Sequence, residues 1–126
     1  MTETKIRRYE AQAASTNTFG RVLCSVRDHH SVIDGPVQNG CPGEEVTPGE
    51  LFLSAVASCG VELLQVIARA EGVPLARVEV AIQGEMDRSN PPRADVSLFN
   101  SVNLQFRMEG VTGDEAKLLV EKFKGR

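Results

Sequence analysis

Residues 47–74 read TPGELFLSAVASCGVELLQVIARAEGVP. Thr47 and Glu50 have the T-x-x-E spacing of a capping box, in which each side chain binds the other residue's backbone N–H at a helix N-terminus. Gly72, followed by Pro74, is typical of a helix C-terminus. Between these signals apolar residues occur at nearly every position, and this pattern predicts one long helix buried in the core.

Alternating apolar and polar residues predict antiparallel strands on both sides of this helix. The alternation covers residues 22–26 before the helix and residues 78–82 and 102–108 after it, and residues 4–13 and 31–33 can add two further strands. A second T-x-x-E box, at Thr112 and Glu115, opens an amphipathic helix. This order of elements predicts an α+β fold, and 126 residues fit one domain.

The composition narrows the classes of function. The net charge is −3 and 5% of the residues are aromatic, whereas a nucleic-acid surface needs clustered Lys and Arg. The N-terminus lacks the apolar core of a signal peptide, and the longest uncharged apolar run, residues 51–61, is too short to cross a bilayer. The three cysteines show no CxxC pair and no metal-ligand spacing, and an odd count fits a reducing compartment. We therefore expect a cytoplasmic protein that binds neither nucleic acid nor membrane.

Three stretches carry a resemblance to a known family. They are H-S-V-I-D-G-P (30–36), T-P-G-E-L-F-L-S-A-V-A-S-C (47–59) and G-V-P-L-A-R-V-E-V (72–80). Together with the order of the elements, they resemble the OsmC/Ohr family, the osmotically inducible and organic-hydroperoxide-resistance proteins. Within this family, the residues of the three stretches are most similar to the OsmC-like branch. The P-x-E-L…A-x-x-x-C block is the most specific part of the resemblance, which covers residues 21–126.

The resemblance implies an α+β, OsmC-like fold of antiparallel sheets around a long buried central helix, built as an intertwined homodimer with active sites at the subunit interface. It also implies reduction of organic hydroperoxides or hydrogen peroxide by a cysteine on the central helix, in a site that an arginine and a glutamate polarise. A second cysteine after the last helix would close a disulfide that an external dithiol reduces. No metal or bound organic cofactor is implied. Residues 1–126 are then a single OsmC-like domain.

Cys59 is the candidate peroxidatic cysteine. Breaking an O–O bond needs a thiolate, because the neutral thiol is a poor nucleophile. Burial in an apolar helix would raise the pKa of the thiol unless a cation lay nearby. The residues alone favour a small apolar core residue, as free cysteines usually are, whereas the matching block around Cys59 favours the peroxidatic role.

The resemblance assigns the glutamate to Glu50 and the arginine to Arg21. Glu50 is fully explained as a capping residue, and it lies nine residues before Cys59, on roughly the opposite helix face. It would therefore serve the Cys59 of the other subunit. The peroxidase branches have a glutamate directly after the proline, where this chain has Gly49. Arg21 follows Gly20, as in one branch of the family, and its other interpretation is an exposed strand residue.

The second family cysteine has no counterpart, because the chain ends at Arg126, where a C-P dipeptide is expected. Either the chain is truncated at its C-terminus or the protein works with one thiol. Cys41 precedes a proline but lies in a loop, and we expect Cys24 in the core. Adjacent His29 and His30 would point to opposite faces of a strand and cannot bind one metal ion.

Two functions stay open at this point. The first is thiol-dependent reduction of hydroperoxides in oxidative-stress defence, with Cys59, Glu50 and Arg21 at the site and an external dithiol as reductant. The alternative is a non-catalytic OsmC-like dimer that binds a small apolar ligand or a partner protein. Three features favour the alternative: Gly49 in place of the glutamate, an arginine that matches only one branch, and the absent second cysteine. The block around Cys59 favours the first function.

Overall fold

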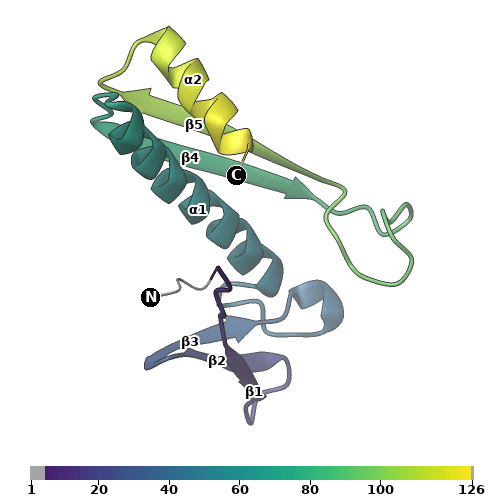
Figure 1. The fold of residues 1–126 in the computed structure, drawn as a ribbon. Coiled ribbons are helices and arrows are strands. Elements are labelled where there is room, and N and C mark those ends of the chain that lie inside the picture. Colours follow the sequence, from purple (N-terminus) through teal and green to yellow (C-terminus); the bar gives the residue numbers. More distant parts are fainter. Residues whose placement is uncertain (1–4, 126) are drawn as a thin grey trace. The chain divides into compact units, whose positions relative to one another are not determined.

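Two antiparallel sheets and two α-helices make up the part of the chain that the computed structural model describes, residues 5–125. Figure 1 labels the elements. They are β1 (Gln12–Ser15), β2 (Arg21–Val26), β3 (His29–Asp34), the 3-10 helix η1 (Val37–Asn39), α1 (Pro48–Glu71), β4 (Arg77–Glu85), β5 (Ser101–Glu109) and α2 (Gly113–Lys124). The chain divides into two compact units, Met1–Leu51 and Phe52–Arg126. The α+β class expected from the sequence is confirmed.

The first unit is a three-stranded antiparallel sheet in the order β1-β2-β3. Its buried residues, among those described, are Ile33 and Asp34, which are 5% and 0% exposed. β1 is four residues long, and it pairs with β2 from Gln12 to Ser15. The strand expected over residues 4–13 is therefore wrong for residues 5–11, because a strand extends only where a neighbouring strand pairs with it. Residue 4 lies outside the described residues.

Both ends of α1 are where the sequence predicts them. The backbone N–H of Thr47 donates to Oε1 of Glu50 over 3.0 Å, and the backbone N–H of Glu50 donates to Oγ1 of Thr47 over 3.4 Å. At the other end Gly72 has φ +68°, a left-handed conformation that is least costly for glycine. The N–H of Val73 donates to the carbonyl of Ala68 over 2.9 Å, which completes a Schellman motif.

The second unit has its core between the β4–β5 hairpin and the two helices (Figure 1). Burial alternates along β4, and it also alternates along β5 from Leu104 onwards, at positions that pair with β4. One face of the hairpin is therefore apolar. Val78 lies on this face, and Leu64, Ile67 and Ala68 of α1 and Leu119 of α2 form one buried cluster with it. Burying each leucine stabilises the fold by about 1.5–3 kcal/mol, so the hairpin fixes how α1 and α2 lie on it.

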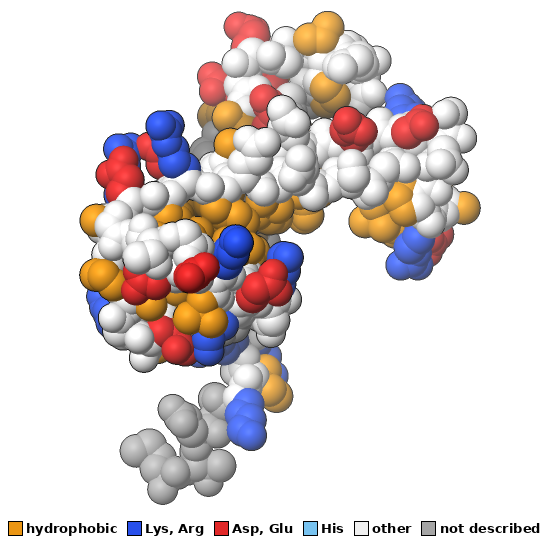
Figure 2. All heavy atoms as spheres, turned by 90° about the horizontal axis from the view of Figure 1, so that it is seen from above, with side chains coloured by type: hydrophobic (Ala, Val, Ile, Leu, Met, Phe, Trp, Pro, Cys, Tyr) orange, Lys and Arg blue, Asp and Glu red, His pale blue; other side chains and the backbone are white. Residues whose placement is uncertain are grey.

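Helix α1 is buried on one face, whereas its composition predicts burial all round. Its buried residues are Gly60, Leu64, Ile67 and Ala68. Phe52 and Val66 are 53% and 44% exposed, and Figure 2 shows hydrophobic side chains uncovered at the surface. By length and composition alone the helix could span a membrane, as many core helices could, and 22% of its most apolar 18-residue stretch is buried. This stretch is longer than the run 51–61 considered above.

Leu119 and its neighbour Leu118 allow a direct test of this core. Leu119 is 0% exposed and Leu118 is 43% exposed on the same helix. We expect Leu119→Ala to lower the free energy of unfolding by about 2–5 kcal/mol, because it removes buried methyl groups and leaves a cavity. Leu118→Ala should change it by less than about 1 kcal/mol. Urea unfolding measures both, and equal losses for the two variants would contradict the packing described.

Candidate functional site

The thiol of Cys59 lies exposed in the middle of α1. The next residue, Gly60, belongs to the buried face, and each residue of a helix turns about 100° around the axis. The chain therefore directs Cys59 away from the core that Leu64 enters. In the part of the chain that the structure describes, no hydrogen bond or ion pair holds this thiol. A dissolved peroxide can reach it, unlike the buried cysteine that the apolar sequence suggested.

Arg21 forms a bidentate ion pair with Asp34 in the first unit. Its Nε donates to Oδ1 of Asp34 and its Nη2 donates to Oδ2, both over 2.8 Å. The two residues are direct partners in the β2–β3 register, so the antiparallel pairing itself brings them together. Nη2 also lies 3.4 Å from Oε1 of Glu44. The hydrogen bond to Asp34 raises the pKa of Arg21 above its ordinary value, so its cation is permanent.

Asp34 is the residue that sequence reasoning missed. Its side chain is fully buried, and besides Arg21 it accepts hydrogen bonds from the backbone N–H groups of Glu44 and Glu45, over 3.0 and 2.9 Å to Oδ2. The Arg21 guanidinium above all, helped by these two N–H groups, holds the pKa of Asp34 well below its usual range. Nothing local in the sequence indicates this role, because Asp34-Gly35-Pro36 is also an ordinary turn sequence.

Cys41 packs beside this ion pair. A Cβ added at Gly20 would lie 2.5 Å from Sγ of Cys41, and a Cβ added at Gly35 would also collide with that sulfur. Gly20 precedes Arg21 and Gly35 follows Asp34, so the sulfur occupies a notch between the two glycines. Cys41 therefore has a packing role, where the sequence suggested none.

Glu50 is occupied by the helix cap. Its Oε1 accepts from both the backbone N–H and the hydroxyl of Thr47, over 3.0 and 2.9 Å. These two hydrogen bonds lower its pKa. In the described part of the first unit, the carboxylate partners of Arg21 are Asp34 and Glu44, and Glu50 makes no ion pair with it. The capping role is confirmed, and a role at Cys59 stays a prediction.

The predicted site residues thus belong to both compact units. Arg21 and Glu50 lie in Met1–Leu51 without contacting each other, and Cys59 lies in Phe52–Arg126. His29 and His30 are adjacent and exposed on β3, and the ring Nδ1 of His30 lies 2.9 Å from Oγ of Ser25. Within residues 5–125 no three His, Cys, Asp or Glu side chains cluster as metal ligands would.

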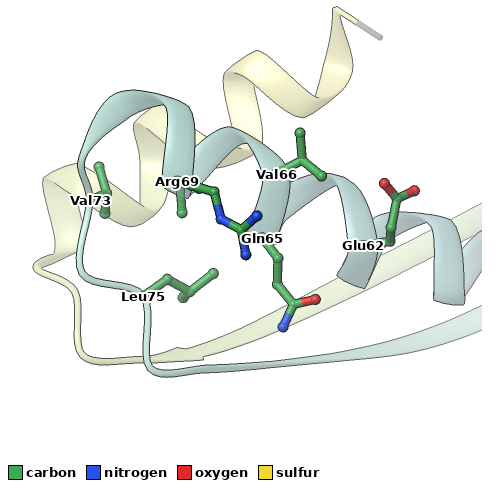
Figure 3. A pocket seen from close by; sticks show the side chains of 7 residues that line it. Glu62, Gln65, Val66, Arg69, Val73 and Leu75 are labelled. Carbon is green, nitrogen blue, oxygen red and sulfur yellow. The ribbon is translucent and has the colours of Figure 1, made fainter.

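A groove of about 370 Å³ runs along the second half of α1. Its walls are Val66, Ala68, Val73 and Leu75, and its polar side chains are Glu62, Gln65 and Arg69. Figure 3 shows Glu62 and Arg69 at the two ends of one helix face, with Gln65 and Val66 between them. No described residue forms an ion pair with Glu62 or Arg69. Sequence reasoning passed over these two charges because it took the helix to be a core helix.

A model of the family described as "OsmC-like protein" matches residues 41–126. The matched range contains Cys59 and Glu50 and begins after Arg21. No curated protein matches the sequence significantly. The match confirms the resemblance seen in the three sequence stretches.

Several solved structures share the fold. An OsmC-like protein from Mycoplasma pneumoniae is 16% identical, with a TM-score of 0.79 over 95% of this chain and 82% of that chain. An organic hydroperoxide resistance protein OsmC from Legionella pneumophila is 20% identical, with a TM-score of 0.73 over 94% and 83%. An organic hydroperoxide resistance protein from Elizabethkingia anophelis is 17% identical, with a TM-score of 0.73 over 95% and 83%. At such identities the likeness is one of fold.

The ion pair of Asp34 predicts a specific loss of stability in acid. Because the pKa of this carboxyl is lower in the folded than in the unfolded chain, its contribution is complete above the unfolded value of about 3.9 and is lost as the pH falls below it. Asp34→Asn should therefore be less stable than the parent protein at pH 7, and the difference should shrink in acid. Urea unfolding at a series of pH values measures this. The matched control is Asp28→Asn, an exposed aspartate of the same unit, and a difference that stayed constant with pH for Asp34→Asn would contradict the assignment.

Proposed function

The chain belongs to the OsmC-like family, and on this premise we propose that it reduces organic hydroperoxides or hydrogen peroxide in oxidative-stress defence, with Cys59 as the attacking thiol. The observation that carries the proposal is the exposed thiol of Cys59 in the middle of α1, within the range that the family model matches. Two proteins of similar fold are named organic hydroperoxide resistance proteins, which supports a role in the defence against hydroperoxides.

The proposed reaction has two balanced steps. The Cys59 thiolate attacks one oxygen of the O–O bond, and the other oxygen leaves with a proton as the alcohol, or as water from hydrogen peroxide. Cys59 is then a sulfenic acid. An external dithiol attacks the sulfenic sulfur and releases water, and its second thiol displaces Cys59 from the mixed disulfide. The cycle ends with a reduced Cys59 and an oxidised dithiol, and it requires one protein thiol.

Arg21 is the proposed cation of this site, and Asp34 positions it. The pair fixes Nε and Nη2 of the guanidinium, whereas Nη1 has no partner among the described residues. This nitrogen can donate to an anionic oxygen or to a thiolate without breaking the pair with Asp34. Glu50 acts at the Cys59 of the other copy, across the subunit interface.

We also propose the setting in which this chemistry works. The protein acts as a homodimer in the cytoplasm, uses an external dithiol as its reductant, and binds neither nucleic acid nor membrane. A homodimer explains why α1 exposes apolar side chains such as Phe52 and Val66, because a second chain can cover them. It also allows residues of one copy to act at the Cys59 of the other.

The alternative function is a non-catalytic dimer that binds a small apolar ligand or a partner protein. One observation favours it: two carboxylates, Asp34 and Glu44, already surround the charge of Arg21. A cation that is neutralised in this way stabilises a thiolate less than a free one does. The two functions differ in whether the Cys59 thiol is oxidised and reduced in a catalytic cycle.

Replacing each cysteine in turn tests the proposed reaction. We expect Cys59→Ser to reduce the rate of hydroperoxide consumption in the presence of a dithiol by at least about 10³-fold, because serine is not ionised at neutral pH. Cys24→Ser and Cys41→Ser serve as matched controls and should keep most of the rate. Stopped-flow mixing with an organic hydroperoxide measures all three variants. Consumption by Cys59→Ser as fast as by the parent protein would rule out the mechanism.

A further inference from the structure

The connection between β4 and β5 is far longer than a hairpin needs. It runs over residues 86–100 and contains no helix or strand of its own, whereas about two to five residues suffice to join two antiparallel strands. Figure 1 shows the loop extending beyond the ends of both strands. Ordered connections of this length usually have a function, often the binding of a ligand. The length therefore indicates a role beyond joining the strands.

The loop is anchored to the rest of its unit. Its two ends are joined by Asn100, whose side-chain Oδ1 accepts a hydrogen bond from the backbone N–H of Asp87 over 2.7 Å. The ring of Phe99 stacks on that of Phe52 in α1, with 5.7 Å between the ring centroids. A Cβ added at Gly84 would lie 2.8 Å from two carbons of the Phe99 ring, so this ring fits over a glycine. These contacts give the loop a defined conformation.

The loop surrounds a hollow of about 260 Å³ that has an apolar wall. Met86, Val96 and Leu98 line it, and they are 49%, 44% and 43% exposed. Large apolar side chains are unfavourable in water, and where they gather around a hollow they are typical of a binding site. Sites for drug-sized molecules begin at about 300 Å³, so this hollow fits a small ligand.

The charged side chains around this hollow differ in their partners. Arg93 is paired with Asp95, and its Nε donates to Oδ1 of that residue over 2.9 Å. Oδ1 of Asp87 accepts from the backbone N–H of Ser89 over 3.0 Å and also from its hydroxyl, which holds this carboxylate in its own turn. The guanidinium of Arg88 makes no ion pair or hydrogen bond with any residue from 5 to 125. Among these residues, the charge of the hollow without a partner is therefore a cation.

We propose that this hollow binds a small carboxylate with an apolar body, such as a short-chain fatty acid. The planar guanidinium of Arg88 donates to the two carboxylate oxygens, a geometry that arginine matches well. The apolar body of the ligand covers Met86, Val96 and Leu98. The site goes beyond the proposed peroxide chemistry, because Cys59 is not among the residues that line it.

Titration calorimetry with hexanoate tests the charge. We expect the parent protein to bind hexanoate with a Kd of about 1 mM or tighter, and to bind hexanol, which has the same chain without the charge, at least about tenfold more weakly. Arg88→Gln should weaken hexanoate binding about tenfold, because it removes charge-assisted hydrogen bonds. Arg107→Gln, at an exposed arginine of β5 outside the hollow, is the matched control and should bind like the parent. Absence of binding to the parent, equal binding of hexanol, or equal effects of the two substitutions would overturn the proposal.

A second pair of variants tests the apolar wall. Leu98→Ser should weaken hexanoate binding at least about threefold, because it removes apolar surface that the ligand covers. Leu118→Ser is the matched control, since Leu118 is equally exposed at 43% but lies on α2. Equal binding by the two leucine variants would contradict the assignment of the wall. Cys59→Ser should bind hexanoate like the parent, so the outcome is independent of whether the protein reduces peroxides.

Discussion

Helix α1 has more apolar surface than its own hairpin covers, and this imbalance shapes the rest of the molecule. The hairpin β4–β5 and helix α2 bury one face of α1, around Leu64 and Ile67. The opposite face keeps Val66 and the thiol of Cys59 in contact with solvent. Exposed apolar surface of this kind is unfavourable in water, and the same lack of cover leaves the thiol of Cys59 accessible.

The charged groups of the protein differ in whether they form ion pairs. In the first unit the buried Asp34 receives Arg21 and two backbone N–H groups, and this arrangement satisfies a carboxylate that would otherwise be costly to bury. On the exposed face of α1, Glu62 and Arg69 are left without such partners. Paired charges therefore stabilise the first unit, whereas Glu62 and Arg69 stay at the surface of α1.

Local signals were the most predictable from the sequence. The capping box at Thr47 and the glycine at Gly72 gave both ends of α1, because each depends on neighbouring backbone groups alone. Alternation likewise gave β4 and β5 within one or two residues at most ends. The family itself followed from the residues around Cys59.

What depends on distant partners was less predictable. The expected first strand is too long, because the length of β1 is set by its pairing with β2. The composition of α1 predicts a helix that is buried all round, because composition alone does not show which apolar residues are covered. The role of Asp34 depends on Arg21 across the strands, thirteen residues away, and no local pattern indicates it. The difference in α1 concerns Cys59 directly, because the covered face of this helix decides whether the thiol is buried or exposed.

Oxidation of Cys59 by a hydroperoxide tests the proposed function most directly. In a Cys24→Ser/Cys41→Ser protein Cys59 is the only thiol, and its sulfenic acid can be trapped with dimedone and detected by intact mass after one equivalent of an organic hydroperoxide is added. We predict that the dimedone adduct forms at Cys59 and that an external dithiol added before dimedone prevents it. A Cys59 thiol that stays unmodified would contradict the proposed function.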